Sequence, residues 1–431
     1  MRSARPHLGV RWRLIAPVAA AALGVLSYLA IAQRSASRAP TLEQQAEEFV
    51  TLALSLAEEH PQEVDAYFGP QALATRDKSR VPAMQTLLRR AQMLHAELQM
   101  RAGDASARRA NLLRQIDSFS GLLQVMQSPE KYSFDEEARL IYGMQPVVVD
   151  GEALNRNLQM LDTLLPGAGS LAQRVDSFRN QFVVAPNRQK AVFERALSEC
   201  RARTMARWKL PADEQLIVEW THDVDAAWHR YQGRHHSTLQ LNPAAVSYVD
   251  SAVDVACHEG YPGHHAQFVV MDVDAGADGL TVENTLVLLR SPISMLREGA
   301  AEYGVDLAFP RDERLTFERD VLFPLAGLDP LQAEKYVTVH RLIRELSSNA
   351  VPILRDYRDK RLSSEIAGRA LQSTALLSSP QSLLRFVDEL GPYVLGYTAA
   401  HDEVRTYVEA RSRQTGEDRW TVLRRVLTPA E

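Results

Sequence analysis

Residues 258–265 read HEGYPGHH, and the Pro-Gly pair at positions 262 and 263 limits what the chain around it can form. Proline removes a backbone hydrogen bond from a helix, and glycine allows dihedral angles that other residues avoid. The segment therefore predicts a helix that breaks and bulges between His258 and His264. On an unbroken helix, residues six apart point roughly 120° away from each other, so these two imidazoles converge only if the helix is interrupted.

Two converging imidazoles are typical of a metal site. Zinc binds His nitrogen at about 2.0–2.1 Å and takes three protein ligands in hydrolases, while one position stays open for water. Two residues looped out at the break would return His264 to the place of the second His in the His-Glu-x-x-His pattern of helical zinc hydrolases. Glu259 is then predicted as the general base. His265 is interpreted as a neighbour of the site rather than a ligand.

The third ligand is expected in the segment LREGAAEYG, residues 296–304. Glu298 is predicted to bind the metal. Glu302 lies one helical turn later and is predicted to orient a ligand His from outside the coordination sphere. Glu283 is the competing third ligand. The pattern therefore predicts a site for one Zn²⁺ ion.

Composition excludes some functions. The 431 residues are 45% hydrophobic and 24% charged, as in an ordinary globular protein. A net charge of -5 provides no basic surface, so nucleic acid is not expected as a partner. Cys200 and Cys257 could pair, but Cys257 directly precedes His258 and is interpreted as a small buried thiol.

The N-terminus predicts export. Several arginines precede an uncharged run from Leu14 to Ala32, which as a helix would be about 28 Å long, close to the hydrocarbon thickness of a bilayer. The positive flank favours a cytoplasmic N-terminus and an exported remainder. The run also ends in a sequence that fits signal-peptidase cleavage. Residues 1–33 are thus expected to form a transmembrane signal anchor or a signal peptide, and residues 34–40 a linker. The domain is expected in a bacterial cell envelope, anchored to the inner membrane or secreted to the periplasm.

Helical patterns dominate the remaining chain. From Leu87 the apolar positions fall on one stripe, and Asp104 can cap the following helix. Two short runs, 214–220 and 237–242, are rich in strand-forming residues and predict a small hairpin or two edge strands. Further helices are expected near residues 42–59, 151–164, 169–182 and 187–207.

The predicted fold class is mostly α, a two-lobed helical metallopeptidase-like fold with a central cleft and a small β-hairpin or sheet near the active site. Residues 41–210 are expected to form a helical lobe and residues 211–431 the lobe with the metal site. Asn242-Pro243 supplies the cap and first turn of a helix that leads to His258.

HEGYPGHHAQ, from residue 258, and REGAAEYG, from residue 297, resemble the signature pair of the bacterial family called domain of unknown function 885. The family patterns are H-E-x-x-P-G-H-x-x-Q and E-G-W-A-x-Y. These proteins are predominantly helical and similar to zinc peptidases of the gluzincin type, including carboxypeptidase Taq and the thimet oligopeptidase group. The resemblance implies the metal ligands His258, His264 and Glu298 and the base Glu259.

The resemblance is weaker towards the C-terminus. GPYVLGYTAAHDEVR, from residue 391, resembles the family's P-G-Q-A-x-x-Y segment, which implies that Tyr397 donates a hydrogen bond to the oxyanion. A core aromatic is the alternative for Tyr397. His340, in a helix that resembles the family's R-L-x-x-E-L segment, is a candidate electrostatic stabiliser. Ala300 replaces the motif's Trp and the D-T-G-x-H stretch is missing, so specificity is not transferred.

Together these features predict an exported zinc metallohydrolase, first of all a peptidase. Glu259, Tyr397 and His340 are its candidate catalytic residues, and a peptide or small amide is the expected substrate. One alternative is a non-catalytic cell-envelope binding protein that retains a metal site. Another is a zinc amidohydrolase that acts on a non-peptide amide.

Overall fold

The computed structural model describes residues 40–75, 82–101, 106–145, 148–276 and 279–428. The chain divides into two units, residues 1–45 and 46–431, and the candidate site lies in the second. The proposed division into lobes at residue 210 stays a prediction, as do the two-lobed arrangement and the central cleft.

The predicted transmembrane anchor needs correction. No described helix is long and apolar enough to cross a membrane. The longest described helices, α5 (Ala107–Gln127) and α9 (Pro186–Met205), carry charged residues along their length. This finding contradicts the membrane and signal-anchor prediction, and we do not pursue it. The predicted segment itself, residues 14–32, lies outside the described residues.

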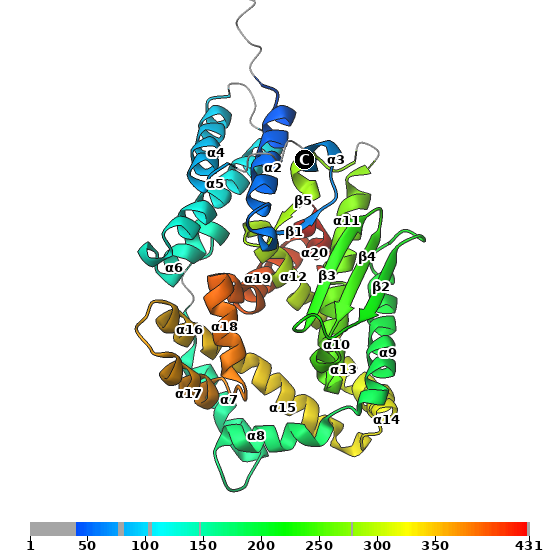
Figure 1. Cartoon of the computed structure of the whole chain (residues 1–431). Coiled ribbons are helices and arrows are strands. Elements are labelled where there is room, and N and C mark those ends of the chain that lie inside the picture. Colours follow the sequence, from blue (N-terminus) through cyan, green and yellow to red (C-terminus); the bar gives the residue numbers. More distant parts are fainter. Residues whose placement is uncertain (1–39, 76–81, 102–105, 146–147, 277–278, 429–431) are drawn as a thin grey trace, which may run out of the picture. The chain divides into compact units, whose positions relative to one another are not determined.

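The described chain is mostly helical with two small sheets, which confirms the predicted fold class (Figure 1). The cap of α5 is Ser106, whose hydroxyl accepts a hydrogen bond from the backbone N–H of Arg109. The predicted cap, Asp104, lies outside the described residues. The other α-helices are α2 Leu42–Ala57, α3 Gln71–Ala74, α4 Met84–Gln99, α6 Phe134–Glu137, α7 Gly151–Leu164, α8 Leu171–Arg179, α10 Val249–Val255, α11 His264–Asp274, α12 Pro292–Ala308, α13 Arg311–Phe317, α14 Phe323–Ala326, α15 Ala333–Leu346, α16 Ala350–Arg358, α17 Ser364–Thr374, α18 Pro380–Leu390, α19 Ala399–Thr415 and α20 Arg419–Leu427.

The larger sheet has three strands in the order β2-β4-β3, with β2 Gln215–Trp220, β3 Ala227–Gly233 and β4 His236–Leu241. The two predicted runs are therefore neighbours, but β2 and β4 are parallel and do not form a hairpin. The segment that connects them in the sequence forms the third strand, β3. Its alternate residues His229 and Tyr231 are buried, as expected for a strand with one face towards the core. The hairpin forms between β3 and β4, which are antiparallel. A second sheet pairs β1 Val64–Tyr67 with β5 Leu286–Leu288.

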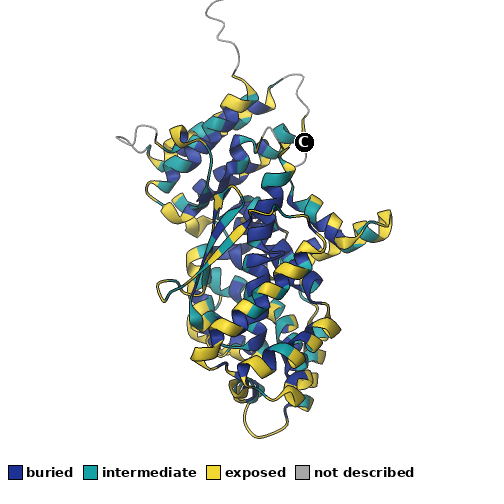
Figure 2. Cartoon of the chain, turned by 90° about the vertical axis from the view of Figure 1, so that its right-hand side faces the viewer, coloured by how far each residue is buried: buried dark blue, intermediate teal, exposed yellow. Residues whose placement is uncertain are grey.

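Buried residues gather on the inward-facing sides of the helices, and exposed residues lie on the outward-facing sides (Figure 2). Asn242 caps a short 3₁₀ turn by accepting a hydrogen bond from the Ala244 N–H at 3.0 Å. Helix α10 follows, and Val249 and Val253 are completely buried on its inner side. This packing fixes the direction from which the chain reaches His258.

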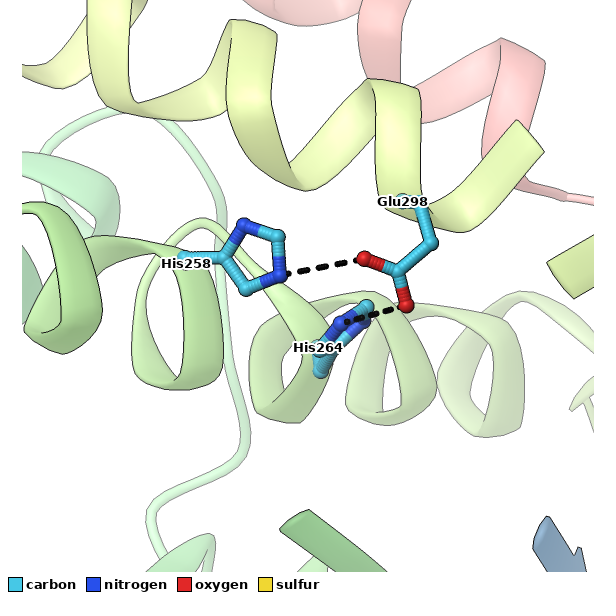
Figure 3. A group of neighbouring side chains, drawn as sticks. All are labelled: His258, His264 and Glu298. Atoms are coloured by element: carbon cyan, nitrogen blue, oxygen red, sulfur yellow. Dashed lines mark ion pairs between the residues drawn. The ribbon is translucent and has the colours of Figure 1, made fainter. Parts of the chain in front are cut away.

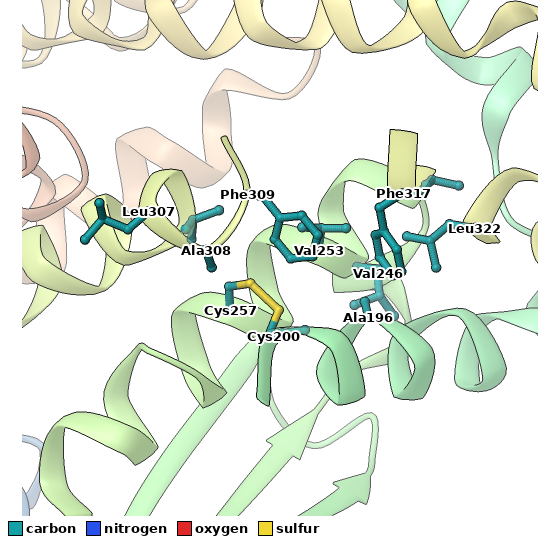
Figure 4. Close-up of a cluster of buried hydrophobic side chains, with 14 of the residues drawn as sticks. Ala196, Cys200, Val246, Val253, Cys257, Leu307, Ala308, Phe309, Phe317 and Leu322 are labelled. Atoms are coloured by element: carbon teal, nitrogen blue, oxygen red, sulfur yellow. A yellow bond between two sulfur atoms is a disulfide. The ribbon is translucent and has the colours of Figure 1, made fainter. Parts of the chain in front are cut away.

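Cys200 and Cys257 form a disulfide, so the prediction of a free thiol at Cys257 is wrong (Figure 4). The bond joins α9 to the end of α10, across a sequence separation of 57 residues and a Cα–Cα distance of 5.4 Å. It lies among buried apolar side chains that include Val253 and Phe309. Because disulfides persist in oxidising compartments, this one indicates an extracytoplasmic protein. The coarse part of the predicted localisation is thus supported.

Candidate metal centre

The helix break at the Pro-Gly pair is present. Helix α10 ends in a π-helical turn at Ala256–Gly260, and α11 begins at His264. The Tyr261–Pro262 peptide bond is cis. Gly263 donates its N–H to the Cys257 carbonyl at 2.9 Å, and a Cβ at this position would lie 1.7 Å from the His258 carbonyl oxygen. Only glycine fits so close to the backbone of the turn.

The break brings the predicted ligands together. His258, His264 and Glu298 each offer a ligand atom, and these atoms lie within 4.8 Å of one another. His258 Nε2 lies 3.2 Å from Glu298 Oε2, and His264 Nε2 lies 3.4 Å from Glu298 Oε1. Figure 3 shows the three side chains pointing toward one another. We name these three residues the metal group. In the part of the chain that the structure describes, no other set of His, Cys, Asp and Glu is arranged in this way.

The metal group fits a zinc ion by its chemistry. Two imidazoles and one carboxylate are a usual zinc donor set. Burial raises the pKa of Glu298, but the neighbouring His264 charge and hydrogen bonds from His258 and His264 lower it below its usual range. Glu298 therefore remains a carboxylate, the form that binds cations. Its Oε2 atom is shielded from solvent and faces His258 Nε2 at 3.2 Å.

Residues around the metal group hold its members in place. Glu302 Oε1 lies 3.1 Å from His258 Nδ1, where a carboxylate that orients this imidazole is expected. Arg344 in turn donates to Glu302 Oε2 at 3.2 Å. The orienting role of Glu302 stays a prediction, and its position agrees with that role.

Tyr393 was not predicted. Its hydroxyl donates to Glu298 Oε1 at 2.8 Å and lies 3.1 Å from the Ser294 hydroxyl. The backbone can approach so closely because of Gly396, where a Cβ would lie 2.8 Å from the Glu298 Cβ. The segment GPYVLGY contains two tyrosines, and the family resemblance directed attention to Tyr397 alone.

The three candidate catalytic residues have different surroundings. Glu259 follows His258 in the π-helical turn, and no hydrogen bond or ion pair joins its carboxylate to a described residue. Tyr397 is 40% exposed, and its ring centroid lies 6.0 Å from that of His258. Tyr397 is thus beside the metal group rather than in the core, and its oxyanion role stays a prediction. His340 is buried, with Nε2 3.1 Å from Asp250. The structure does not bring His340 into the metal group.

Two other candidates have partners elsewhere. His265 is completely buried, with Nδ1 2.8 Å from the Ser237 hydroxyl and Nε2 2.8 Å from Glu214 Oε2. Glu283, the competing third ligand, accepts two hydrogen bonds from Arg108 at 2.7 and 2.8 Å. Neither residue belongs to the metal group.

A cavity of about 630 Å³ adjoins the metal group. Glu302 and Tyr397, which both contact His258, form part of its wall, together with charged residues that include Arg344, His401 and Arg405. Its volume is within the range of small-molecule sites, about 300–1,000 Å³.

No family model matches the chain, and no curated protein matches it. A solved structure described as "the crystal structure of the putative lipoprotein from Colwellia psychrerythraea" is similar at 15% sequence identity, with a TM-score of 0.48. That similarity covers 81% of this chain and 67% of the other.

Proposed function

We propose that this chain is a zinc-dependent hydrolase of amide bonds, with peptides as the first substrate class to test. The observation that carries the proposal is the convergence of His258, His264 and Glu298 beside a partner-free Glu259. When bound by such residues, zinc polarises a carbonyl group and lowers the pKa of a water molecule to about 7.

In this proposal, Glu259 is the general base. Its carboxylate takes a proton from the attacking water and later delivers it to the leaving amine. Because no described residue engages this carboxylate, no existing hydrogen bond has to break first. Tyr393 and Glu302 keep Glu298 and His258 in orientation, and the adjoining cavity offers room for substrate.

The resemblance to domain of unknown function 885 supports the same proposal, since its motif positions are the residues that converge. A non-catalytic envelope protein with a metal site is the alternative, and it requires Glu259 to have no effect on turnover. A zinc amidohydrolase would use the same metal chemistry but would cleave a non-peptide amide and not peptides.

The test uses the purified full-length chain with a mixed peptide library and measured zinc content. Glu259→Gln should lower cleavage by about 10²–10⁴-fold and leave bound zinc unchanged. Glu219→Gln, an exposed carboxylate on β2, is the matched control and should change neither. If the chain binds zinc but shows no cleavage that depends on Glu259, the result would instead support the hypothesis of a non-catalytic binding protein.

A further inference from the structure

His229 has no role in the proposal so far. It lies on β3 with only 7% of its surface exposed. Its Nε2 atom is shielded from solvent and has no hydrogen-bond partner among the described residues. Buried polar atoms nearly always have partners, so an unpaired imidazole nitrogen needs an explanation.

The surroundings of His229 connect it to the metal group. Its ring centroid lies 6.0 Å from that of His264, a predicted ligand, and its ring stacks on Phe268 at 5.8 Å. His229 is not a member of the metal group, whose ligand atoms all lie within 4.8 Å of one another. It therefore lies next to the coordinating side chains without joining them.

A neighbouring histidine provides the contrast. His265 lies 6.5 Å from His229 between ring centroids, yet both of its nitrogens have partners, Ser237 and Glu214. Because both nitrogens of His265 have hydrogen-bond partners within the protein, we interpret His265 as a structural residue. His229 is also buried, at 7% exposure against 0% for His265, but its Nε2 atom has no such partner.

A second unpaired group lies on the same aromatic ring. The Arg297 guanidinium lies 4.2 Å from the centroid of Phe268, and its Nη1 atom is buried without a partner. Its Nη2 atom donates to the Met271 sulfur at 3.0 Å. Burial lowers the pKa of Arg297, and the charge of the nearby Asp65 carboxylate opposes this effect. Asp65 also interacts with His264 and Glu298, so positive and negative charges both border this side of the metal group.

We propose that His229 is a catalytic residue that donates a hydrogen bond to the substrate carbonyl oxygen as this oxygen becomes negatively charged. This inference rests on the proposed hydrolase function. The proton stays on His229 throughout, and the residue acts by stabilising charge.

The test compares zinc-loaded full-length wild type with His229→Phe, which keeps a flat ring but has no donor, and with His229→Gln, which keeps one. The Phe variant should lower kcat by about 10²–10³-fold with KM changed only a few-fold, and Gln should recover part of the loss. Bound zinc should stay the same in all three. His236→Gln, on neighbouring β4, is the matched control. If the Phe variant does not fold, His229→Leu replaces it.

A second readout separates this inference from the hydrolase proposal. Binding of a tripeptide analogue with a phosphonate in place of the scissile amide is measured by calorimetry. The inference predicts weaker binding in the Phe variant by a factor similar to that in kcat, even if no cleavable peptide is found for the wild type. Loss of zinc from the variant would show that His229 is a ligand and overturn the inference. Unchanged kcat and unchanged phosphonate binding would also overturn it.

Discussion

Two largely buried clusters of charged and polar residues share the stretch of chain from Asp250 to His264, and they differ in how far their members pair with one another. The first, the ion cluster, comprises Asp250, Asp254, Arg314, Glu318 and His340. Each of these side chains has an oppositely charged or ionisable partner within 3.3 Å. The second is the metal group, which begins with His258, only four residues after Asp254.

Beside the metal group, two buried atoms make no hydrogen bond with a described residue. These are Nε2 of His229 and Nη1 of Arg297. In the ion cluster the charges are paired, although Glu318 Oε2 is also buried without a hydrogen-bond partner among the described residues and His340 and Arg314 line the same cavity as Tyr397. We expect a cluster of paired charges to act mainly on the stability of the fold. A cluster that leaves polar atoms unpaired in a closed space has a physical need for something else, such as a cation or a substrate oxygen. This difference separates His340 from His229, although both are buried imidazoles.

The largest expected effect concerns the third ligand. Glu298→Gln should weaken zinc binding by clearly more than the roughly 10–100-fold expected for an outer-sphere residue. Glu302→Gln should fall within that smaller range, because Glu302 contacts only the far nitrogen of His258. Zinc titration with a competing chelator measures both. Equal losses would contradict the assignment of Glu298 as a ligand and Glu302 as an outer partner.

The ion cluster should matter for stability and not for metal. Asp250→Asn removes one charge opposite His340 and Arg179 and should lower the free energy of unfolding by about 3–5 kcal/mol. Urea unfolding measures this loss, and bound zinc should stay unchanged. Asp320→Asn, which breaks an exposed pair with Arg319, is the control and should have little effect. Loss of zinc from folded Asp250→Asn would show that the two clusters are not separate.

The disulfide ties the metal group to α9. Replacing both Cys200 and Cys257 with Ser should lower the free energy of unfolding by about 2–4 kcal/mol. Because Cys257 directly precedes His258, zinc affinity should also fall. Reduction of the wild type should reproduce both effects and leave the double variant unchanged. A fully stable double variant would mean that packing alone holds this turn.

The smallest effect concerns His401 in the cavity wall. Burial alone would lower the pKa of His401, but hydrogen bonds to Asp306 and Asp402 raise it to about 9. Since the pKa is higher in the folded state, the stabilisation is complete below about pH 6.5 and is lost as the pH rises through about 9. Wild type should exceed His401→Gln by about 1–2 kcal/mol at pH 6 and lose this advantage by pH 10. An exposed control, His222→Gln, should show no such trend, and a difference independent of pH would refute the ion-pair explanation.

Local sequence signals predicted much of the fold. Helix boundaries such as 151–164 follow from spacing and capping, and the break at Pro262-Gly263 follows from backbone chemistry. The pairing of the strands could not be predicted from local signals, because β2 and β4 are neighbours in the sheet although β3 lies between them in the sequence. The Cys200–Cys257 bond likewise depends on the packing of α9 against α10.

The residues of the site also fall into those that local sequence predicts and those that only tertiary packing brings together. His258, His264 and Glu298 come from motifs, so the sequence could name them before the structure brought them together. Tyr393 lies in a segment with a family resemblance, but that resemblance pointed to Tyr397, and the strand of His229 carries no motif. Only tertiary packing places these two residues near the metal group.

The most direct test is zinc K-edge X-ray absorption on the full-length chain, loaded with equimolar zinc and dialysed. Our account predicts one tightly bound zinc per chain, with only nitrogen and oxygen neighbours at about 2.0–2.2 Å and an imidazole signal that weakens in His264→Ala. A chain that retains no zinc after dialysis, or whose zinc environment is unchanged in His264→Ala, would contradict the account.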